Sequence, residues 1–256
     1  MDKRILQISN FLAVVLTIVV NSLANILPIN GKNTGQLSDN IPNLFVPSGI
    51  TFAIWGVIYL LLILFAIYQA RDFFKKEKIE MPYLTKITPF FILASAANIL
   101  WIFLWHYEQV ALSLIAMLIL LISLIAIYIK LNVGQQQTPL KEKMFIHVPF
   151  SVYLGWITVA TIANITAWLV IISWDGFGIS DVTWTIIVLC VATLLTLIIL
   201  YKRKDIAYSL VIIWALLGIV IKRMQDQTEI ATTATIAIVV IIIAIIGTFI
   251  FKYFKK

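Results

Sequence analysis

The sequence predicts an all-α membrane protein, a polytopic bundle of about eight transmembrane helices. Of the 256 residues, 62% are hydrophobic and only 12% are charged, whereas soluble domains have about half and about a quarter. The apolar residues also fall into eight runs close to the roughly 20 residues that cross a bilayer as a helix. Too few residues remain between these runs for a soluble nucleotide-binding or catalytic domain.

The limits of each span are set by charged breaks and by breaks rich in Pro, Gly and Asn. The first run begins with Lys3 and Arg4 and so resembles a signal peptide. Its polar Asn21 and Asn25 instead favour a retained helix that packs against protein. The seventh run is the shortest. The predicted spans are 5–28, 47–70, 87–106, 109–131, 144–172, 182–201, 206–221 and 229–251.

The distribution of basic residues orients the chain. Sixteen of the 19 lysines and arginines lie in the termini and in the alternate loops that share a side with them. The other loops carry three basic and six acidic residues. Because basic loops remain cytoplasmic, both termini are predicted to be cytoplasmic, with the cell membrane as the expected location. We assign the net charge of +7 to topology and to contact with anionic membrane lipids, and not to nucleic acid.

Several classes of function are disfavoured by what the predicted spans lack. They hold no Asp, Glu, Lys or Arg away from their ends, which argues against ion-coupled transport. His106 and His147 fall at opposite faces of the membrane and Cys190 is the single cysteine, so no metal site is expected. No nucleophile, metalloprotease or phosphate-binding motif is present, so we expect no catalytic residues and no enzyme activity. His106 as a lone axial haem ligand is the remaining alternative.

Aromatic residues are concentrated in the half of the bundle predicted to be outermost. At about 100° per residue, three spans each place aromatic side chains and small or amide residues on one face. Such faces suit the walls of one cavity for a flat apolar ligand. The alternative is that Asn98 and Asn164 join helices, with alanines allowing close packing. The candidate faces are Trp55 and Tyr59; Asn98, Trp101 and Trp105; and Tyr153, Trp156, Ala160 and Asn164, with Trp168 at the edge.

These residues resemble the TspO/MBR family, the tryptophan-rich sensory proteins related to the mitochondrial translocator protein. Residues 153–161, with Asn164 and Trp168, are similar to the family's Y-L-x-W-V-S-x-A-T-x-x-N-x-x-x-W. Asn98, Trp101 and Trp105 resemble its L-N-x-x-W followed by an aromatic residue. Pro47, with Trp55 and Tyr59, resembles a proline-rich loop that leads into W-x-x-x-Y.

The resemblance covers residues 1–172 and implies a five-helix core with a tetrapyrrole or sterol pocket capped by the first loop, about residues 29–46. Four positions depart from the family pattern and argue against light-dependent porphyrin breakdown: Gly49, Ala53, Val152 and Leu169. Residues 173–256 form a three-helix extension. The extension could pack laterally, bind a partner or form the surface of a homodimer.

The leading hypothesis is a membrane receptor, sensor or carrier for a flat apolar ligand, with a porphyrin or haem as the bound molecule and no required cofactor. The alternative is a transporter of a small amphipathic metabolite or lipid that is not coupled to ions. A photo-oxidative enzyme that uses bound porphyrin is a third hypothesis. Membrane lipids and one small apolar molecule are the expected partners.

Overall fold

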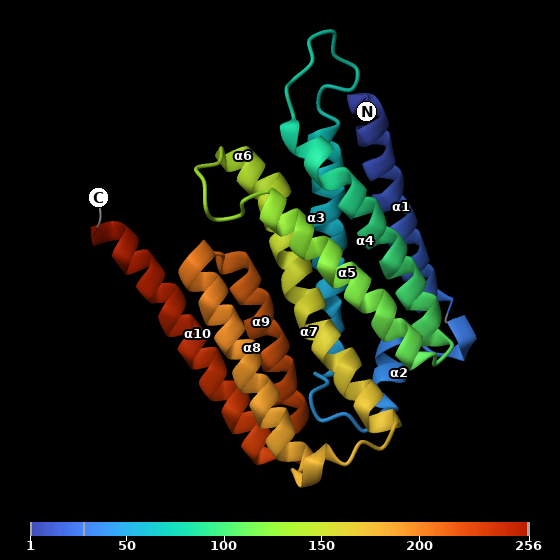
Figure 1. The fold of residues 1–256 in the computed structure, drawn as a ribbon, viewed down its shortest axis with the longest axis vertical. Coiled ribbons are helices and arrows are strands. Elements are labelled where there is room, and N and C mark those ends of the chain that lie inside the picture. Colours follow the sequence, from blue (N-terminus) through green and yellow to red (C-terminus); the bar gives the residue numbers. More distant parts are fainter. Residues whose placement is uncertain (1, 28, 255–256) are drawn as a thin grey trace.

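The chain folds as an all-α bundle in a computed structural model that describes residues 2–27 and 29–254, with side chains to residue 250 (Figure 1). Eight helical segments of the described chain are long and apolar enough to cross a membrane. The predicted fold class is therefore confirmed. The long helices are α1 Lys3–Ile26, α3 Ile54–Gln69, α4 Pro82–His106, α5 Val110–Lys130, α7 Val148–Ile171, α8 Asp181–Arg203, α9 Ile206–Arg223 and α10 Thr228–Phe254; α2 Thr34–Asp39 and α6 Leu140–Glu142 are short.

The observed helix ends differ from the predicted spans where local chemistry extends an apolar run. α4 begins at Pro82, five residues before the predicted span, because proline is well suited to the first turn of a helix. α7 is preceded by α6 and by a π-helical turn at Lys143–His147. The shortest predicted span is the regular helix α9. The end of the first span at residue 28 lies outside the described residues, as do Lys255 and Lys256.

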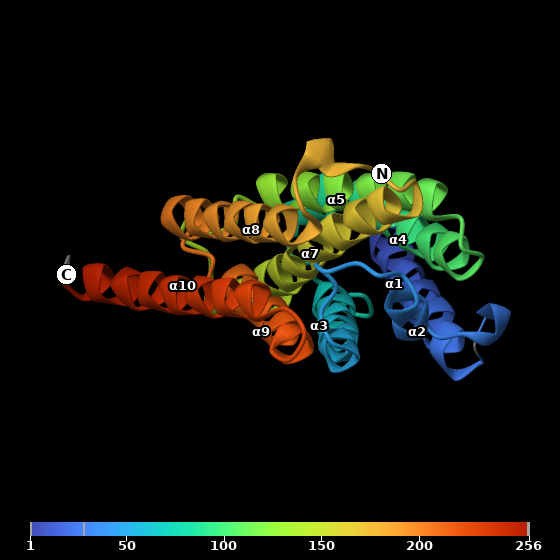
Figure 2. The ribbon, with the colours of Figure 1, turned by 90° about the horizontal axis from the view of Figure 1, so that it is seen from below.

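Five helices form one group, in which α1 packs on α3 and α4, α4 on α5, and α7 on both α3 and α5. The last three helices pack on one another and form the second group, which lies to one side in Figure 2. α9 joins the groups by packing against α7. Gly155 permits this approach, because a Cβ atom there would lie 3.1 Å from Cβ of Val211 and 3.2 Å from the Tyr208 oxygen. The division of the chain at residue 172 stays a prediction.

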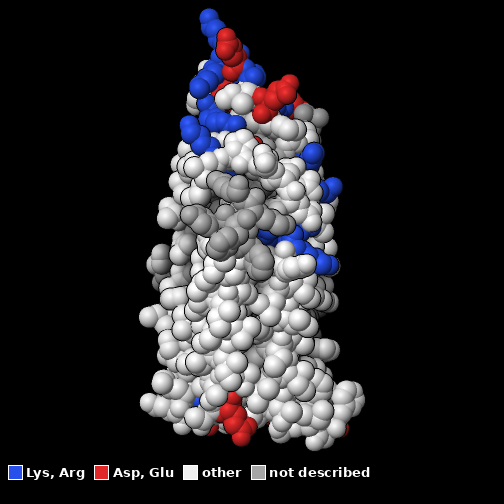
Figure 3. Space-filling view, turned by 90° about the vertical axis from the view of Figure 1, so that its left-hand side faces the viewer, with Lys and Arg blue, Asp and Glu red and all other residues white. Residues whose placement is uncertain are grey.

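Charged residues gather at the two ends of the bundle (Figure 3). In this view the lysines and arginines lie mostly in the half that holds the N-terminus, together with several acidic residues, whereas the charged residues visible at the opposite end are mainly acidic. We call the latter the α2 end, because α2 lies there in Figure 1. This asymmetry is the one expected of a multi-pass membrane protein, and the prediction that the N-terminal end is cytoplasmic rests on it.

A buried polar network fixes the N-terminal end of α1. The Asp72 carboxylate, 1% exposed, follows α3 and forms an ion pair with Lys3. It also accepts hydrogen bonds from Gln7 Nε2 at 2.9 Å and from the Ile79 amide at 2.7 Å. Gln7 and Gln69 bond to each other's backbone oxygen. These contacts join α1 to the α3–α4 loop.

We expect the ion pair between Lys3 and Asp72 to make stability depend on pH in strong acid. Burial alone would raise the pKa of Asp72, but hydrogen bonds from Lys3, Gln7 and the Ile79 amide lower it to about 2. Since the folded pKa lies below the unfolded value, the contribution is complete above about pH 4 and disappears as the pH falls toward 2. Asp72→Asn should remove this dependence and cost about 2 kcal/mol at neutral pH.

Thermal unfolding in detergent between pH 2 and pH 7 measures this effect. Glu77→Gln is the matched control, since Glu77 is an exposed acid of the same loop. An Asp72→Asn protein with wild-type stability at pH 7 would contradict the role of the network.

Candidate functional site

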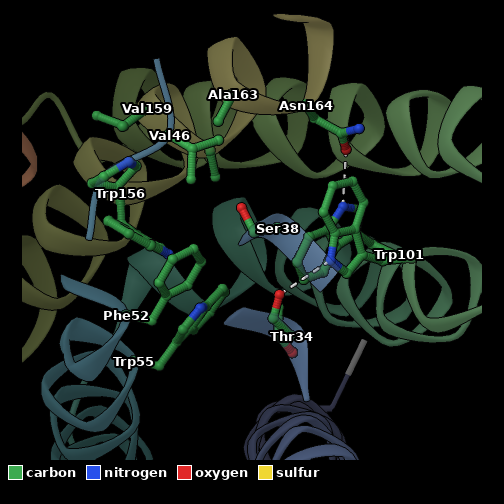
Figure 4. Close-up of a pocket in the computed structure, with 13 residues that line it drawn as sticks. Thr34, Ser38, Val46, Phe52, Trp55, Trp101, Trp156, Val159, Ala163 and Asn164 are labelled. Carbon is green, nitrogen blue, oxygen red and sulfur yellow. Dashed lines mark hydrogen bonds between the residues drawn. The ribbon is translucent and has the colours of Figure 1, made fainter. Parts of the chain in front are cut away.

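An aromatic cavity lies at the α2 end, between α3, α4, α7 and the connection from α2 to α3 (Figure 4). We call residues 34–53 the lid, because this segment covers the cavity. The cavity is small, about 40 Å³, which is room for only one or two water molecules. Its lining residues are Thr34, Ser38, Val46, Pro47, Phe52, Trp55, Trp101, Trp105, Trp156, Val159, Ala160, Ala163 and Asn164.

Four indoles line the cavity. Trp101 and Trp105 are one helical turn apart on α4 and stack with ring centroids 5.8 Å apart. Trp55 of α3 meets Trp156 of α7 edge to face at 6.4 Å. Figure 4 shows Phe52, Trp55 and Trp156 on one side of the cavity and Trp101 on the other. The result is a pair of facing aromatic walls from three helices and the lid.

Asn164 holds one of these walls in place. Its Oδ1 accepts a hydrogen bond from Trp101 Nε1 at 3.0 Å, and its amide group also exchanges hydrogen bonds with Ser113 Oγ. Trp105 Nε1 donates to the backbone oxygen of Thr34 in the lid, at 3.4 Å. Asn164 is therefore a positioning residue that orients the Trp101 ring.

Two polar groups of the cavity residues have no hydrogen-bond partner in the described chain, namely Trp156 Nε1 and Thr34 Oγ1. A buried group left in this state costs about 1–3 kcal/mol. A ligand or water that offered an acceptor to Trp156 would recover that cost. The wall is thus apolar with an unsatisfied donor, the composition of a binding site for a ring system that carries a few oxygens.

Seven of the eleven predicted site residues line this cavity: Pro47, Trp55, Trp101, Trp105, Trp156, Ala160 and Asn164. Tyr59 stacks on Trp55 at 5.6 Å and Tyr153 meets the same ring edge to face at 6.0 Å. These two tyrosines therefore pack against the Trp55 ring and do not line the cavity themselves. Trp168 is half-buried against the hydrophobic core and is not among the lining residues.

Asn98 also lies away from the cavity and connects two helices. Its Oδ1 accepts a hydrogen bond from Asn21 Nδ2 at 2.7 Å, and both side chains are buried. Asn98 thus connects α4 to α1 in this structure, and α1 packs against protein through the polar Asn21.

Six lining residues are absent from the predicted site. Val159 and Ala163 belong to the α7 face that carries Ala160, so helical spacing could have found them. The other four belong to the lid, where irregular backbone gives no periodic signal: Thr34, Ser38, Val46 and Phe52. A capping box between Asn33 and Gln36 starts α2, and this local signal alone does not say what α2 covers.

The lid is held in place by α9 of the three-helix extension. Arg223, 8% exposed, donates through Nε to the Leu44 oxygen at 3.0 Å and through Nη2 to the Asn43 oxygen at 2.7 Å. Trp214 Nε1 donates to the Thr51 oxygen at 2.9 Å. The sequence did not reveal these contacts, which join residues about 160–180 positions apart along the chain.

At Gly218, α9 lies in close contact with the lid. The Ser48 amide donates to the Gly218 oxygen at 3.0 Å. A Cβ atom on Gly218 would lie 1.9 Å from Thr51 Oγ1 and 2.8 Å from Pro47 Cβ. The absence of a side chain at Gly218 is therefore what allows α9 to lie directly on the lid.

His106 does not face the aromatic cavity. Its Nδ1 lies 2.7 Å from the Ile102 oxygen of its own helix, and its Nε2 is buried without a partner in the described chain. It is not a lining residue. His106 is therefore not placed to contact a molecule in the aromatic cavity of this structure.

Comparison with known proteins places the chain by sequence. The profile of the family described as TSPO-like protein matches residues 7–247, a range that includes α8, α9 and most of α10. No curated protein and no solved structure matches the chain. With eight apolar helices and a family match over most of its length, the chain is an integral multi-pass membrane protein that belongs to the TSPO-like protein family.

Proposed function

We propose that this protein is a membrane receptor or carrier that binds a flat apolar molecule, with a tetrapyrrole such as protoporphyrin as the first candidate, in the aromatic cavity. The cavity wall carries the proposal, since four indoles face one another and Trp156 Nε1 is an unpaired donor. Flat aromatic faces bury a planar ring system efficiently, and the donor suits an oxygen of the ligand. Family membership supports a sensing or binding role.

The lid must move for such a ligand to enter. A cavity of about 40 Å³ is far below the several hundred Å³ that a ligand of this size occupies. The helices around the cavity are fixed by packing, α4 on α1 and α5, and α7 on α3 and α5. The lid is instead attached to α9 by a small set of hydrogen bonds. Ligand binding and the contact between lid and α9 are therefore expected to be coupled.

Filling the cavity tests the proposal. Ala160→Phe places a phenyl ring among the lining residues, and we expect it to weaken protoporphyrin IX binding at least tenfold, about 1.4 kcal/mol. The Kd is measured from the Soret shift of the porphyrin with protein in detergent. Ala111→Phe on the exposed face of α5 is the matched control and should bind as wild type. Equal affinity in both variants would overturn the proposed site.

Ligand binding is the activity that the receptor and carrier hypotheses share. Proteoliposomes that contain the protein distinguish a receptor from a transporter, because a receptor takes up ligand only in proportion to the number of protein molecules. Transfer of many ligand molecules by each protein molecule would favour the alternative of a transporter for an amphipathic compound.

A further inference from the structure

A second and larger cavity lies at the α2 end, between the end of α7 and the start of α8, with a volume of about 430 Å³. Residues 42–44 form its third side, so the lid segment 42–47 separates it from the aromatic cavity. α8 packs on α9 and α10, and residues 172–180 carry the chain from α7 across to it (Figure 1). The cavity therefore exists because the extension diverges from the core here.

The walls of this second cavity combine an apolar part with an aromatic and polar part. Leu169 of α7 and Val188 of α8 are apolar lining residues. Trp174 and Trp184 also line it, and their ring centroids lie 5.2 Å apart at an angle of 51°. Trp184 is fixed by the hydrogen bond from its Nε1 to the Gly176 oxygen, at 2.8 Å. The paired indoles thus form a rigid corner at the end of an apolar cavity.

Asp181 gives the second cavity its charge. The other described residues that line this cavity are uncharged. In the described chain the Asp181 carboxylate has no salt bridge and no hydrogen bond. The three basic residues of the α2 end each pair with another acid: Lys32 with Glu108, Lys222 with Asp39, and Arg223 with Asp226. No protein cation of the described chain thus pairs directly with Asp181, and the Arg223 guanidinium, which donates to the backbone oxygens of Asn43 and Leu44 in the cavity wall, is engaged with Asp226.

We propose that this second cavity binds an amphiphile with a cationic ammonium head group. The ammonium lies between the Asp181 carboxylate and the faces of Trp174 and Trp184, where ion pairing and cation–π attraction act together. The alkyl chain packs on Leu169 and Val188. An amphiphile fits because the cavity lies at the end of two membrane-spanning helices, where head group and chain each meet a matching surface.

Binding of tritiated decyltrimethylammonium to the purified protein in maltoside micelles tests this proposal. We expect saturable binding of one molecule for each chain, competed by unlabelled probe and not by decyl sulfate. Asp181→Asn should weaken binding roughly tenfold. Asp175→Asn is the matched control, because Asp175 is an exposed acid of the same connection that does not line the cavity. Asp181 lies in the first turn of α8, where an acid also stabilises the helix. Probe affinity is therefore the measured quantity, because Asp181→Asn can change stability for this separate reason.

A second variant tests whether the probe binds inside the cavity. Val188→Trp fills the apolar part and should abolish saturable binding of the probe while leaving protoporphyrin IX binding unchanged. If Val188→Trp binds the probe as wild type does, the cavity is not the site. Loss in Val188→Trp with full affinity in Asp181→Asn, or equal competition by decyl sulfate, would overturn the assignment to a cation.

Discussion

Replacing Gly218 by valine is expected to separate α9 from the lid and to lower the free energy of unfolding by about 3 kcal/mol. A Cβ atom at residue 218 would lie 1.9 Å from Thr51 Oγ1 and 2.8 Å from Pro47 Cβ, so either the helix or the lid must shift. Overpacking of this kind costs about 1–3 kcal/mol, and the hydrogen bond from the Ser48 amide to the Gly218 oxygen would be lost as well. Thermal unfolding in detergent measures the effect.

Gly247→Val is the matched control for this substitution. A Cβ atom on Gly247 of α10 would have no heavy atom within 4 Å, so the same change of residue in a helix of the extension should alter the melting temperature little. If Gly218→Val and Gly247→Val melt together, the close contact between α9 and the lid does not stabilise the fold.

Arg223→Ala is expected to loosen the lid without unfolding the helices around the cavity. The buried guanidinium donates to the backbone oxygens of Asn43 and Leu44, and its removal leaves two carbonyls of the lid without these donors. Hydrogen bonds from a charged group contribute about 1.5–3 kcal/mol each, so the lid should open far more often. We expect amide hydrogen exchange over residues 43–53 to rise at least tenfold, with exchange in α4 and α7 unchanged.

Lys222→Ala is the neighbouring control for the arginine. Lys222 pairs with the half-exposed carboxylate of Asp39, and exposed pairs contribute only about 0–1 kcal/mol. Arg223→Lys should behave like Arg223→Ala, since a lysine cannot bridge two carbonyls with the planar geometry of a guanidinium. Unchanged exchange over residues 43–53 in Arg223→Ala would show that other contacts hold the lid.

The helices could be predicted from the sequence because burial in a membrane leaves a strong local signal. Apolar runs of about 20 residues must be helical in hydrocarbon, and even the short α9 was found in this way. The apolar runs do not show which faces of the helices pack against one another. Gly155 and Gly218 each allow α9 to approach a distant segment, and a glycine within a helix does not indicate its partner.

The cavity could be predicted in part, because its wall consists of helix faces. Trp101 and Trp105 on α4, and Trp156 and Ala160 on α7, lie where helical spacing placed them. Asn98 was assigned to the same helix face as Trp101. Such a face spans about 100° or more, so residues at its two edges can contact different neighbouring helices. Asn98 lies toward α1, where Asn21 binds it. The family resemblance implied that the first loop, about residues 29–46, caps the pocket, but the irregular lid gives no periodic signal for its lining residues Thr34, Ser38, Val46 and Phe52.

Tryptophan-fluorescence titration of the purified protein with protoporphyrin IX tests the aromatic cavity most directly. We expect saturable quenching with a Kd that rises roughly tenfold in Trp156→Phe and in Trp101→Phe, since each loses indole surface and Trp156 also loses its free donor. Trp184→Phe, outside the aromatic cavity, should keep the wild-type Kd. Quenching that does not saturate, or one Kd shared by the wild type and all three variants, would contradict the proposed site.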